Sequence, residues 1–337
     1  MVMHVSRRIA CICTLSILSS CGGGLPSVGP SAPSPLAGDA AGARCRIGAI
    51  KVFRGPIGGS GGVSIAGGIG RALWYGDIAL NKIVKMTTKG VSKGYSIPTP
   101  GAGPEGIAKG RNKQMWFTEW NQAKIGSITR KGHVREFAIS GGASGSTSMT
   151  AGPDGRIWFT TSSMGIGAHT IGGSTTFYST GIDSEDPTGI AVGPDGNLWY
   201  TTFHGPHIGM MTTSGAATSF NVGAFGGFGL TAGPDHRVWF ADPGNYRIVA
   251  ISTNGISMSF YSTGTVQPFN IVTAPDRYMY FTTGPGAKIG RISVHGKIAE
   301  CPIRAPQSFV ALGITVGPDG NVWILDNQHS QVARLRI

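Results

Sequence analysis

The sequence is poor in charged residues, which make up 13% of its 337 residues, about half the share found in ordinary soluble domains. This deficit excludes a coiled coil or a charged helical array, and the lack of a Gly-X-Y period excludes collagen. Apolar residues still reach 40%, with 55 Gly and 20 Pro, so the chain is too hydrophobic to be disordered. A globular, turn-rich β protein with a large core remains.

Several motifs of metal-dependent and nucleotide-binding proteins are also missing. After residue 20 there is no phosphate loop, no Cys-x-x-Cys and no His-Glu-x-x-His. The Gly-rich stretch 58–70 leads into no predicted helix, so a dinucleotide site is not expected. The residues alone therefore require no cofactor.

Residues 1–20 have the pattern of an export signal. Two arginines precede the apolar stretch 9–18, which is too short to span a bilayer as a helix. The signal ends in Leu18-Ser19-Ser20-Cys21, which resembles the lipobox of bacterial lipoproteins and implies lipidation of Cys21. The alternative is an ordinary secretory signal. We expect an exported chain, anchored to a membrane of the bacterial cell envelope on its periplasmic or extracellular face.

Residues 21–44 consist almost wholly of Gly, Pro, Ser and Ala. Such a segment cannot bury enough apolar surface to offset the entropy lost on ordering. It predicts a flexible tether between the anchor and a domain formed by residues 45–337.

The domain is a sevenfold repeat whose aromatic anchors recur at intervals of 40 to 43 residues. Each unit predicts four short strands: an apolar stretch, the anchor strand after a tight turn such as 152–155, a strand opening with Ile-Gly, and a strand with an aromatic residue. Four antiparallel strands per unit predict an all-β, seven-bladed β-propeller. The anchors are Trp74-Tyr75, Trp116-Phe117, Trp158-Phe159, Trp199-Tyr200, Trp239-Phe240, Tyr280-Phe281 and Trp323-Ile324.

The last unit is incomplete, because the chain ends at Ile337, before the position of its fourth strand. The segment 47–53 has no unit of its own and contains an aromatic residue. We expect this N-terminal segment to be the outer strand of the seventh blade, which closes the ring and removes two exposed sheet edges.

The repeat resembles the virginiamycin B lyase family over residues 47–337. The resemblance rests on Gly-Pro-Asp-Gly-x-x-Trp-Phe-Thr followed by Ile-Gly-x-Ile, and it is closest at 105–137. It implies a seven-bladed propeller. It also implies a lyase that opens the ester of a cyclic depsipeptide by elimination, assisted by Mg²⁺, with histidines at the start of certain first strands and carboxylates nearby.

The corresponding positions, eleven residues before each anchor, hold no histidine in this sequence. Two functions therefore stay open. The first is a lipid-anchored propeller that binds a small molecule or a protein on its funnel face, the face where the first strands begin. The second is a lyase with a rearranged acid/base set of Glu105, Glu119 and His204. The missing histidines favour the first; the positions hold Val63, Glu105, Thr147, Thr188, Phe228, Phe269 and Leu312.

Carboxylates recur three residues after the anchor, where the second strand ends. Because antiparallel strands reverse direction, we expect these side chains at the funnel rim, with Glu105 and Glu119 of one blade close together. Carboxylate oxygens suit acid/base work and suit Mg²⁺ or Ca²⁺. The alternative is that they cap loops or pair with Lys and Arg. The acidic positions are Asp77, Glu119, Asp242 and Asp326.

His204 and His207 follow the second strand of the fourth unit. Their spacing suits a transition metal, and His204 suits a general base on the funnel rim. Because no Cys or third His is nearby in the sequence, solvated surface positions are the favoured interpretation.

Cys45 and Cys301 are the two cysteines left after export and lipidation. An oxidising compartment allows a disulfide between them. The alternative is a small apolar side chain at 301 and a free thiol at 45, and both interpretations stay open.

The formal net charge of +12 predicts attraction to anionic lipid or cell-surface polymer, or merely a solvated basic surface. Nucleic acid is not an expected partner, because the basic residues are spread through the blades and the signal exports the chain. We expect a monomer.

Overall fold

The computed structural model describes residues 47–56, 59–139, 145–182, 186–223, 226–284, 287–305 and 308–337. The chain divides into two compact units, Met1–Arg46 and Ile47–Ile337, and the second contains all the described residues. The predicted signal, Cys21, the tether and Cys45 lie outside them. Within the described ranges, no helix has the length and apolar character needed to cross a membrane.

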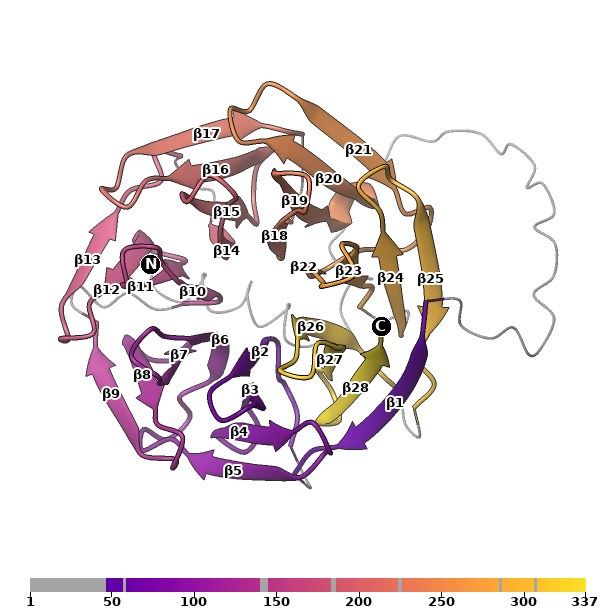
Figure 1. Cartoon of the computed structure of the whole chain (residues 1–337). Helices are drawn as coiled ribbons and strands as arrows, with labels where there is room; N and C mark the ends of the chain where they lie inside the picture. The colour runs from indigo at the N-terminus through magenta and orange to yellow at the C-terminus, as the bar shows by residue number, and fades with distance from the viewer. Residues whose placement is uncertain are drawn as a thin grey trace, which may run out of the picture. The chain divides into compact units, whose positions relative to one another are not determined.

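Seven four-stranded antiparallel sheets form a ring (Figure 1). In six of them the strand order follows the sequence, and the first strand of each blade lies toward the centre of the ring, next to the first strands of its neighbours. The predicted all-β, seven-bladed propeller is confirmed.

The strand bounds of blades 1 to 6 are as follows. Blade 1 contains β2 (Ile65–Gly68), β3 (Ala72–Asp77), β4 (Lys82–Thr87) and β5 (Ser92–Ser96), and blade 2 contains β6 (Pro104–Lys109), β7 (Met115–Glu119), β8 (Lys124–Ile128) and β9 (Val134–Ala138). Blade 3 contains β10 (Met149–Ala151), β11 (Ile157–Thr161), β12 (Gly165–His169) and β13 (Thr175–Tyr178), and blade 4 contains β14 (Pro187–Val192), β15 (Leu198–Thr202), β16 (His207–Met211) and β17 (Ala217–Asn221). Blade 5 contains β18 (Leu230–Ala232), β19 (Arg237–Asp242), the short 3₁₀ helix η2 (Pro243–Asn245), β20 (Arg247–Ser252) and β21 (Met258–Ser262), and blade 6 contains β22 (Ile271–Thr273), β23 (Met279–Thr282), β24 (Lys288–Ile292) and β25 (Ile298–Pro302).

Blade 7 joins the two ends of the domain. It consists of β26 (Ala311–Val316), β27 (Val322–Asp326), β28 (Gln331–Arg336) and β1 (Ala49–Arg54). β1 pairs antiparallel with β28, from Ala49 opposite Arg336 to Arg54 opposite Gln331. The predicted closure by the N-terminal strand is confirmed.

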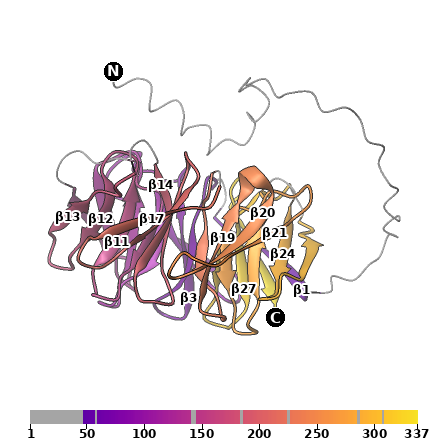
Figure 2. The same cartoon turned by 90° about the horizontal axis from the view of Figure 1, so that it is seen from above.

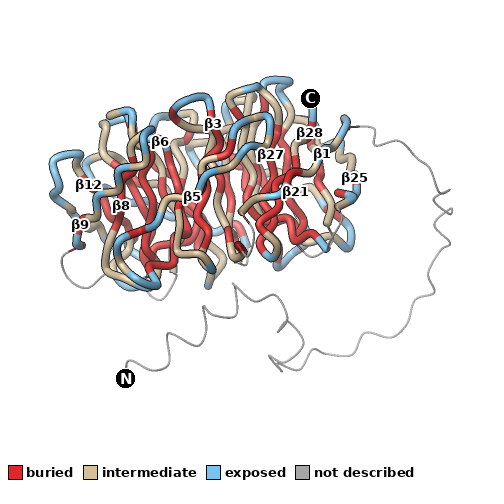
Figure 3. The backbone as a smooth tube through the Cα atoms, turned by 90° about the horizontal axis from the view of Figure 1, so that it is seen from below, coloured by how far each residue is buried: buried red, intermediate tan, exposed pale blue. Residues whose placement is uncertain are grey.

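The anchor residues form the core between the blades. All six anchor tryptophans and Tyr280 are fully buried, and Figure 3 shows the buried backbone running through the strands while exposed positions gather at the turns. Each tryptophan stacks on a ring of the outer strand at 5.3 to 6.1 Å between centroids. In blade 7 this ring is Phe53 of β1. The regular stacking explains why the anchor gives the clearest sequence signal.

The two faces of the ring carry different segments. The first strands begin and the second strands end at the funnel face. The turn between the first and second strands and the turn between the third and fourth strands lie at the opposite face. Figure 2 shows the strands edge-on, with the C-terminus and the label of β1 toward the opposite face. Since Ala49 pairs with Arg336, β1 begins at that opposite face.

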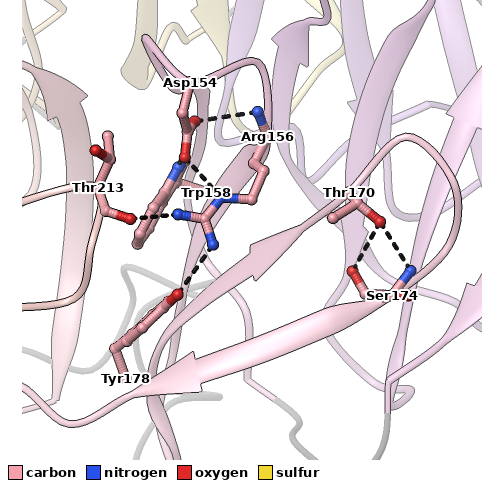
Figure 4. A network of polar contacts seen from close by, with 7 residues as sticks. All are labelled: Asp154, Arg156, Trp158, Thr170, Ser174, Tyr178 and Thr213. Carbon is pink, nitrogen blue, oxygen red and sulfur yellow. Dashed lines mark hydrogen bonds and ion pairs between the residues drawn. The ribbon is translucent and has the colours of Figure 1, made fainter.

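An aspartate fixes the turn between the first and second strands in blades 3 to 7. In blade 3, Asp154 accepts hydrogen bonds from Trp158 Nε1 at 3.1 Å and from Arg156 Nε at 2.6 Å (Figure 4). The Arg156 guanidinium also donates to Tyr178 Oη at 2.9 Å and to the carbonyl oxygen of Thr213 in blade 4. The turn is thereby tied to the outer strand and to the next blade. The other four aspartates are Asp195, Asp235, Asp276 and Asp319.

Blades 1 and 2 form the same turn without an aspartate. Trp74 Nε1 donates to the carbonyl oxygen of Ile69 at 3.0 Å, and Trp116 Nε1 donates to Asn112 Oδ1 at 3.2 Å. In these two blades the indole is satisfied by a neutral acceptor, and the turn carries no negative charge.

Candidate functional site

The starts of the first strands are held by threonines from the preceding blade. Each of these threonines lies two residues after its anchor, in the Trp-Phe-Thr motif and its variants, and donates its hydroxyl to the carbonyl oxygen of the residue eleven positions before the next anchor. Hydrogen bonds between blades fix the backbone at the centre of the funnel face. The pairs are Thr160 with Thr188 at 3.0 Å, Thr201 with Phe228 at 3.2 Å and Thr282 with Leu312 at 2.9 Å.

Three phenylalanines form a continuous row over blades 4 to 6 at the funnel face. The ring centroid of Phe228 lies 5.8 Å from that of Phe203 and 5.6 Å from that of Phe269, and all three side chains are only half-buried. The Phe269 ring packs on Gly284, where an added Cβ would lie 2.5 Å from a ring carbon. We call these three residues the phenylalanine row.

In the sequence, Phe228 and Phe269 stand out only because they are not histidine. Phe203, which lies just after β15 and completes the row, was not predicted as a site residue. The available signal was the placement of two aromatic residues at equivalent positions of neighbouring units. Partly exposed aromatic rings in contact offer a surface on which an apolar or aromatic ligand can be buried.

His204 borders the phenylalanine row. Its ring centroid lies 4.8 Å from that of Phe203, and its Nδ1 lies 3.5 Å from Asp186 Oδ2. The side chain is half-exposed, so it is accessible to a ligand on this face. A nearby carboxylate can orient a histidine for proton transfer, and the role of His204 as a base stays a prediction.

His207 lies at the start of β16 and is half-buried, and its carbonyl oxygen accepts a hydrogen bond from Thr202 Oγ1 at 2.9 Å. Among the residues that the structure describes, no group of three or more His, Cys, Asp or Glu could hold a metal ion. The His-x-x-His spacing therefore gives no metal centre within these ranges.

Glu119 is buried with no hydrogen-bond partner for either carboxylate oxygen. The ammonium group of Lys124, its neighbour on β8, instead lies 2.6 Å from Thr99 Oγ1 and 3.9 Å from Glu136 Oε2. Burial, and secondarily the negative charge of Glu136, raise the pKa of Glu119 to about 8. The side chain is therefore largely protonated at neutral pH and has no surface that a ligand can reach.

Glu105 lies in β6 and is also buried, with 5% of its surface exposed. Because Pro104 pairs with Glu119, the two glutamates lie at the same end of blade 2. Their carboxylates do not hydrogen-bond to each other, since both oxygens of Glu119 lack a partner. The acid/base and metal-binding roles of Glu105 and Glu119 stay predictions.

The other carboxylates expected at the funnel rim are buried and bound to protein groups. Asp77 Oδ1 accepts from the backbone N of Leu80 at 3.0 Å, Asp242 Oδ2 from Arg247 Nε at 2.7 Å, and Asp326 Oδ2 from Gln331 Nε2 at 3.0 Å. These contacts are those of the alternative in which the side chains cap loops or pair with cations. A ligand role for Asp77, Asp242 and Asp326 stays a prediction. In blades with a threonine there, the hydroxyl also binds nearby backbone. Thr161 and Thr283 accept from the backbone N of Met164 and Lys288, and Thr202 donates to the carbonyl oxygen of His207.

Glu119, as it lies in this structure, is a poor ligand for a magnesium ion. Mg²⁺ binds ionised carboxylates and keeps several waters in its shell. Glu119 has no exposed surface, and its pKa of about 8 keeps it largely protonated at neutral pH. No catalytic step of this chain is therefore assigned to Mg²⁺.

Cys301 lies in β25 opposite Ile289 and is buried. It is disulfide-bonded. Its predicted partner, Cys45, lies outside the described residues, so the pairing of these two cysteines stays a prediction.

Comparison with known proteins points to one family. The model of the virginiamycin B lyase family matches residues 37–144 and 133–337. A solved streptogramin B lyase is 28% identical, with a TM-score of 0.80, and the match covers 86% of this chain and 97% of that one.

Two structures from Staphylococcus aureus are similar to the same degree. A selenomethionine-substituted virginiamycin B lyase is 27% identical with a TM-score of 0.79, and the match covers 86% of this chain and 99% of that one. A catalytically inactive His→Ala variant with quinupristin is 27% identical with a TM-score of 0.80 and the same coverage, 86% and 99%. No curated protein matches the sequence.

Proposed function

The chain belongs to the virginiamycin B lyase family, and we propose that it is a lipid-anchored, exported member that binds an apolar or aromatic ligand on its funnel face. The observation that carries this proposal is the phenylalanine row. Two of its three members, Phe228 and Phe269, occupy the position eleven residues before an anchor, which the family resemblance assigns to histidine in certain blades.

The energetics of the row support binding. Full burial of one phenylalanine side chain is worth about 1.5 to 3 kcal/mol, and a well-placed aromatic contact adds about 0.5 to 1.5 kcal/mol. Because the three rings are half-buried and touch one another, little further ordering is needed when a ligand covers them.

The lipid anchor is the second part of the proposal. It is supported by the apolar stretch 9–18 and the Leu-Ser-Ser-Cys sequence that ends at Cys21. Acylation at Cys21 would hold the propeller at a membrane, with residues 21–44 as the tether.

Removal of the central ring tests the binding site. We expect Phe228→Ala to weaken the binding of quinupristin at least tenfold in isothermal titration, because Phe228 contacts both other rings of the row. Phe260→Ala is the matched control, since Phe260 is 49% exposed on β21, away from the row. Absence of quinupristin binding by the unmodified chain, or equal affinities of all three proteins, would contradict the proposal.

The alternative function is a lyase in which His204 is the base. The observation that favours it is Asp186, whose Oδ2 lies 3.5 Å from His204 Nδ1. In such an elimination, the base takes the proton next to the carbonyl carbon, the electron pair of that C–H bond forms a double bond, and the C–O bond of the ester breaks to release a carboxylate.

We expect little or no opening of the quinupristin ring by the purified chain, with or without Mg²⁺, when product is measured by mass spectrometry. The positions of the family's histidines hold none here, and Glu119 is buried and largely protonated at neutral pH. Robust Mg²⁺-dependent opening that disappears in the Glu105→Gln, Glu119→Gln double variant would promote the lyase over the binding protein.

A further inference from the structure

Exposed cations cover the face of blades 1 and 2 opposite the funnel. They occupy or border the turns between β2 and β3, β4 and β5, β6 and β7, and β8 and β9, whose residues 69–71, 88–91, 110–114 and 129–133 include no Asp or Glu. We call these cations the basic surface. Its members are Arg71, Lys89, Lys109, Arg111, Lys113, Arg130 and Lys131, all exposed.

Within the described residues, the cations of the basic surface form no ion pair with a carboxylate. Among the described residues, none of the ion pairs includes a member of it. Arg130 lies over Gly70 of blade 1, and its carbonyl oxygen accepts a hydrogen bond from Lys85 Nζ at 3.3 Å. Burial, and then the positive charges of Arg130 and Lys93, lower the pKa of Lys85. Cations from two blades are thus close enough to repel one another.

Only blades 1 and 2 lack an aspartate in the turn between the first and second strands. Blades 3 to 7 place an aspartate in the turn before the anchor, and in blades 3 and 5 an arginine neutralises it, as in Arg156 with Asp154. Blades 1 and 2 satisfy the same indole with the Ile69 carbonyl and the Asn112 amide. Compared with blades 3 to 7, the turns of blades 1 and 2 therefore have more cations and lack the aspartate that binds the indole.

The neighbouring blades show the contrast. Residues 149–221, which form blades 3 and 4, contain a single Lys or Arg, Arg156. Residues 65–138, which form blades 1 and 2, contain twelve of the 24 Lys and Arg residues of 47–337, and the other eleven lie in blades 5 to 7. Basic residues are therefore most frequent in blades 1 and 2 and almost absent from blades 3 and 4.

We propose that the basic surface docks the propeller on an anionic membrane, through the phosphates of lipid headgroups. The β1 strand begins at the same face, where Ala49 pairs with Arg336, so the chain that leads from Cys21 joins the domain on the side of the basic surface. The four turns contain no Phe, Tyr or Trp on which a nucleic acid base would stack. An acyl chain and a basic patch together anchor a protein more firmly than one acyl chain alone.

This docking turns the funnel face, with the phenylalanine row, away from the lipid. The proposal takes only the lipid anchor from the proposed function. The docking itself does not depend on the anchor, because cations attract anionic headgroups with or without an acyl chain.

The test uses the chain after export, residues 21–337, carrying Cys21→Ser, which cannot be acylated there, in co-sedimentation with vesicles. We expect binding to vesicles of phosphatidylcholine mixed with phosphatidylglycerol, no binding to phosphatidylcholine alone, and weakening with salt. Adding Arg111→Gln, Lys113→Gln and Lys131→Gln should reduce binding by about fivefold per cation removed.

The matched control removes three cations at the funnel end of the strands, by Arg54→Gln, Lys288→Gln and Arg304→Gln, and should retain binding. Circular dichroism checks that both triple variants are folded. Equal losses in the two variants, or equal binding to both kinds of vesicle, would overturn the proposal. Tighter binding to a DNA duplex than to the anionic vesicles at the same salt concentration would also overturn it.

Failure of the lipid anchor would not change these results, because the tested chain carries no lipid at residue 21. The anchor itself is tested by the mass of the N-terminal peptide of the membrane-extracted chain with Cys21 intact.

Discussion

A chain that lacks residues 45–55 is expected to lose cooperative unfolding. The deletion removes β1, which pairs with β28 along six residues, and removes Phe53, whose ring lies 5.3 Å from that of Trp323. An edge strand would be exposed, and the buried core of blade 7 would open to water. Calorimetry should show a broad transition of low enthalpy in place of one sharp transition.

Two controls separate the strand from its surroundings. Deletion of residues 25–35 shortens the tether but leaves β1 intact, and it should leave the melting transition unchanged. Cys45→Ser removes only the thiol, so any loss that it causes measures the predicted disulfide rather than the strand. A sharp, parent-like transition after deletion of 45–55 would show that the ring does not depend on this closure.

Glu119→Gln is expected to stabilise the protein at pH 8 by about 3 to 5 kcal/mol, which corresponds to a difference in pKa of about three units. The carboxyl ionises near pH 4.5 in the unfolded chain but near pH 8 in the folded one. Its contribution to stability is therefore complete below pH 4.5 and is lost as the pH rises from 4.5 to 8. Glutamine, which resembles the protonated acid, avoids this loss.

Denaturant titrations at pH 4 and pH 8 measure the effect. The parent and the variant should be equally stable at pH 4. At pH 8 the parent should be less stable than the variant, because only the parent has a buried carboxyl that ionises. His169, whose pKa burial lowers to about 4, costs stability below pH 6.5, but it does so in both proteins. The loss therefore cancels in the comparison.

Glu300→Gln is the matched control for Glu119→Gln. Glu300 lies opposite Gly290, as Glu136 lies opposite Gly126, and it pairs with Lys288 at 3.3 Å. Thr283 takes the place of Glu119 in that blade. The control should not change the dependence of stability on pH; an equal change in both variants would mean that the burial of Glu119 is not the cause.

The fold was predictable because each blade repeats the same packing. In every blade but the sixth, a buried tryptophan stacks on an aromatic residue of the outer strand, and this regularity is visible without a structure. The missing fourth strand of the last unit then left one place for residues 47–53, which is where β1 lies.

The details of the site were not predictable in the same way, because they depend on contacts between blades. The repeat places Glu119 at the end of a second strand, but its lack of a partner follows from Lys124, which reaches Thr99 and Glu136 instead. The phenylalanine row likewise joins residues 203, 228 and 269 of three blades. A periodic sequence gives each residue its position within a blade, but it does not show which side chains of neighbouring blades contact one another.

The pairing of β1 with β28 also determines when the domain can fold. Translation makes β1 before any other described strand of the propeller and makes its partner β28 after all the others, so the ring cannot close until β28 has been made. Pairing between such distant segments is slow because their encounter costs loop-closure entropy. In the export that we propose for this chain, the polypeptide would cross the membrane unfolded, and the late pairing of β1 with β28 would keep the ring open until both strands are on the far side.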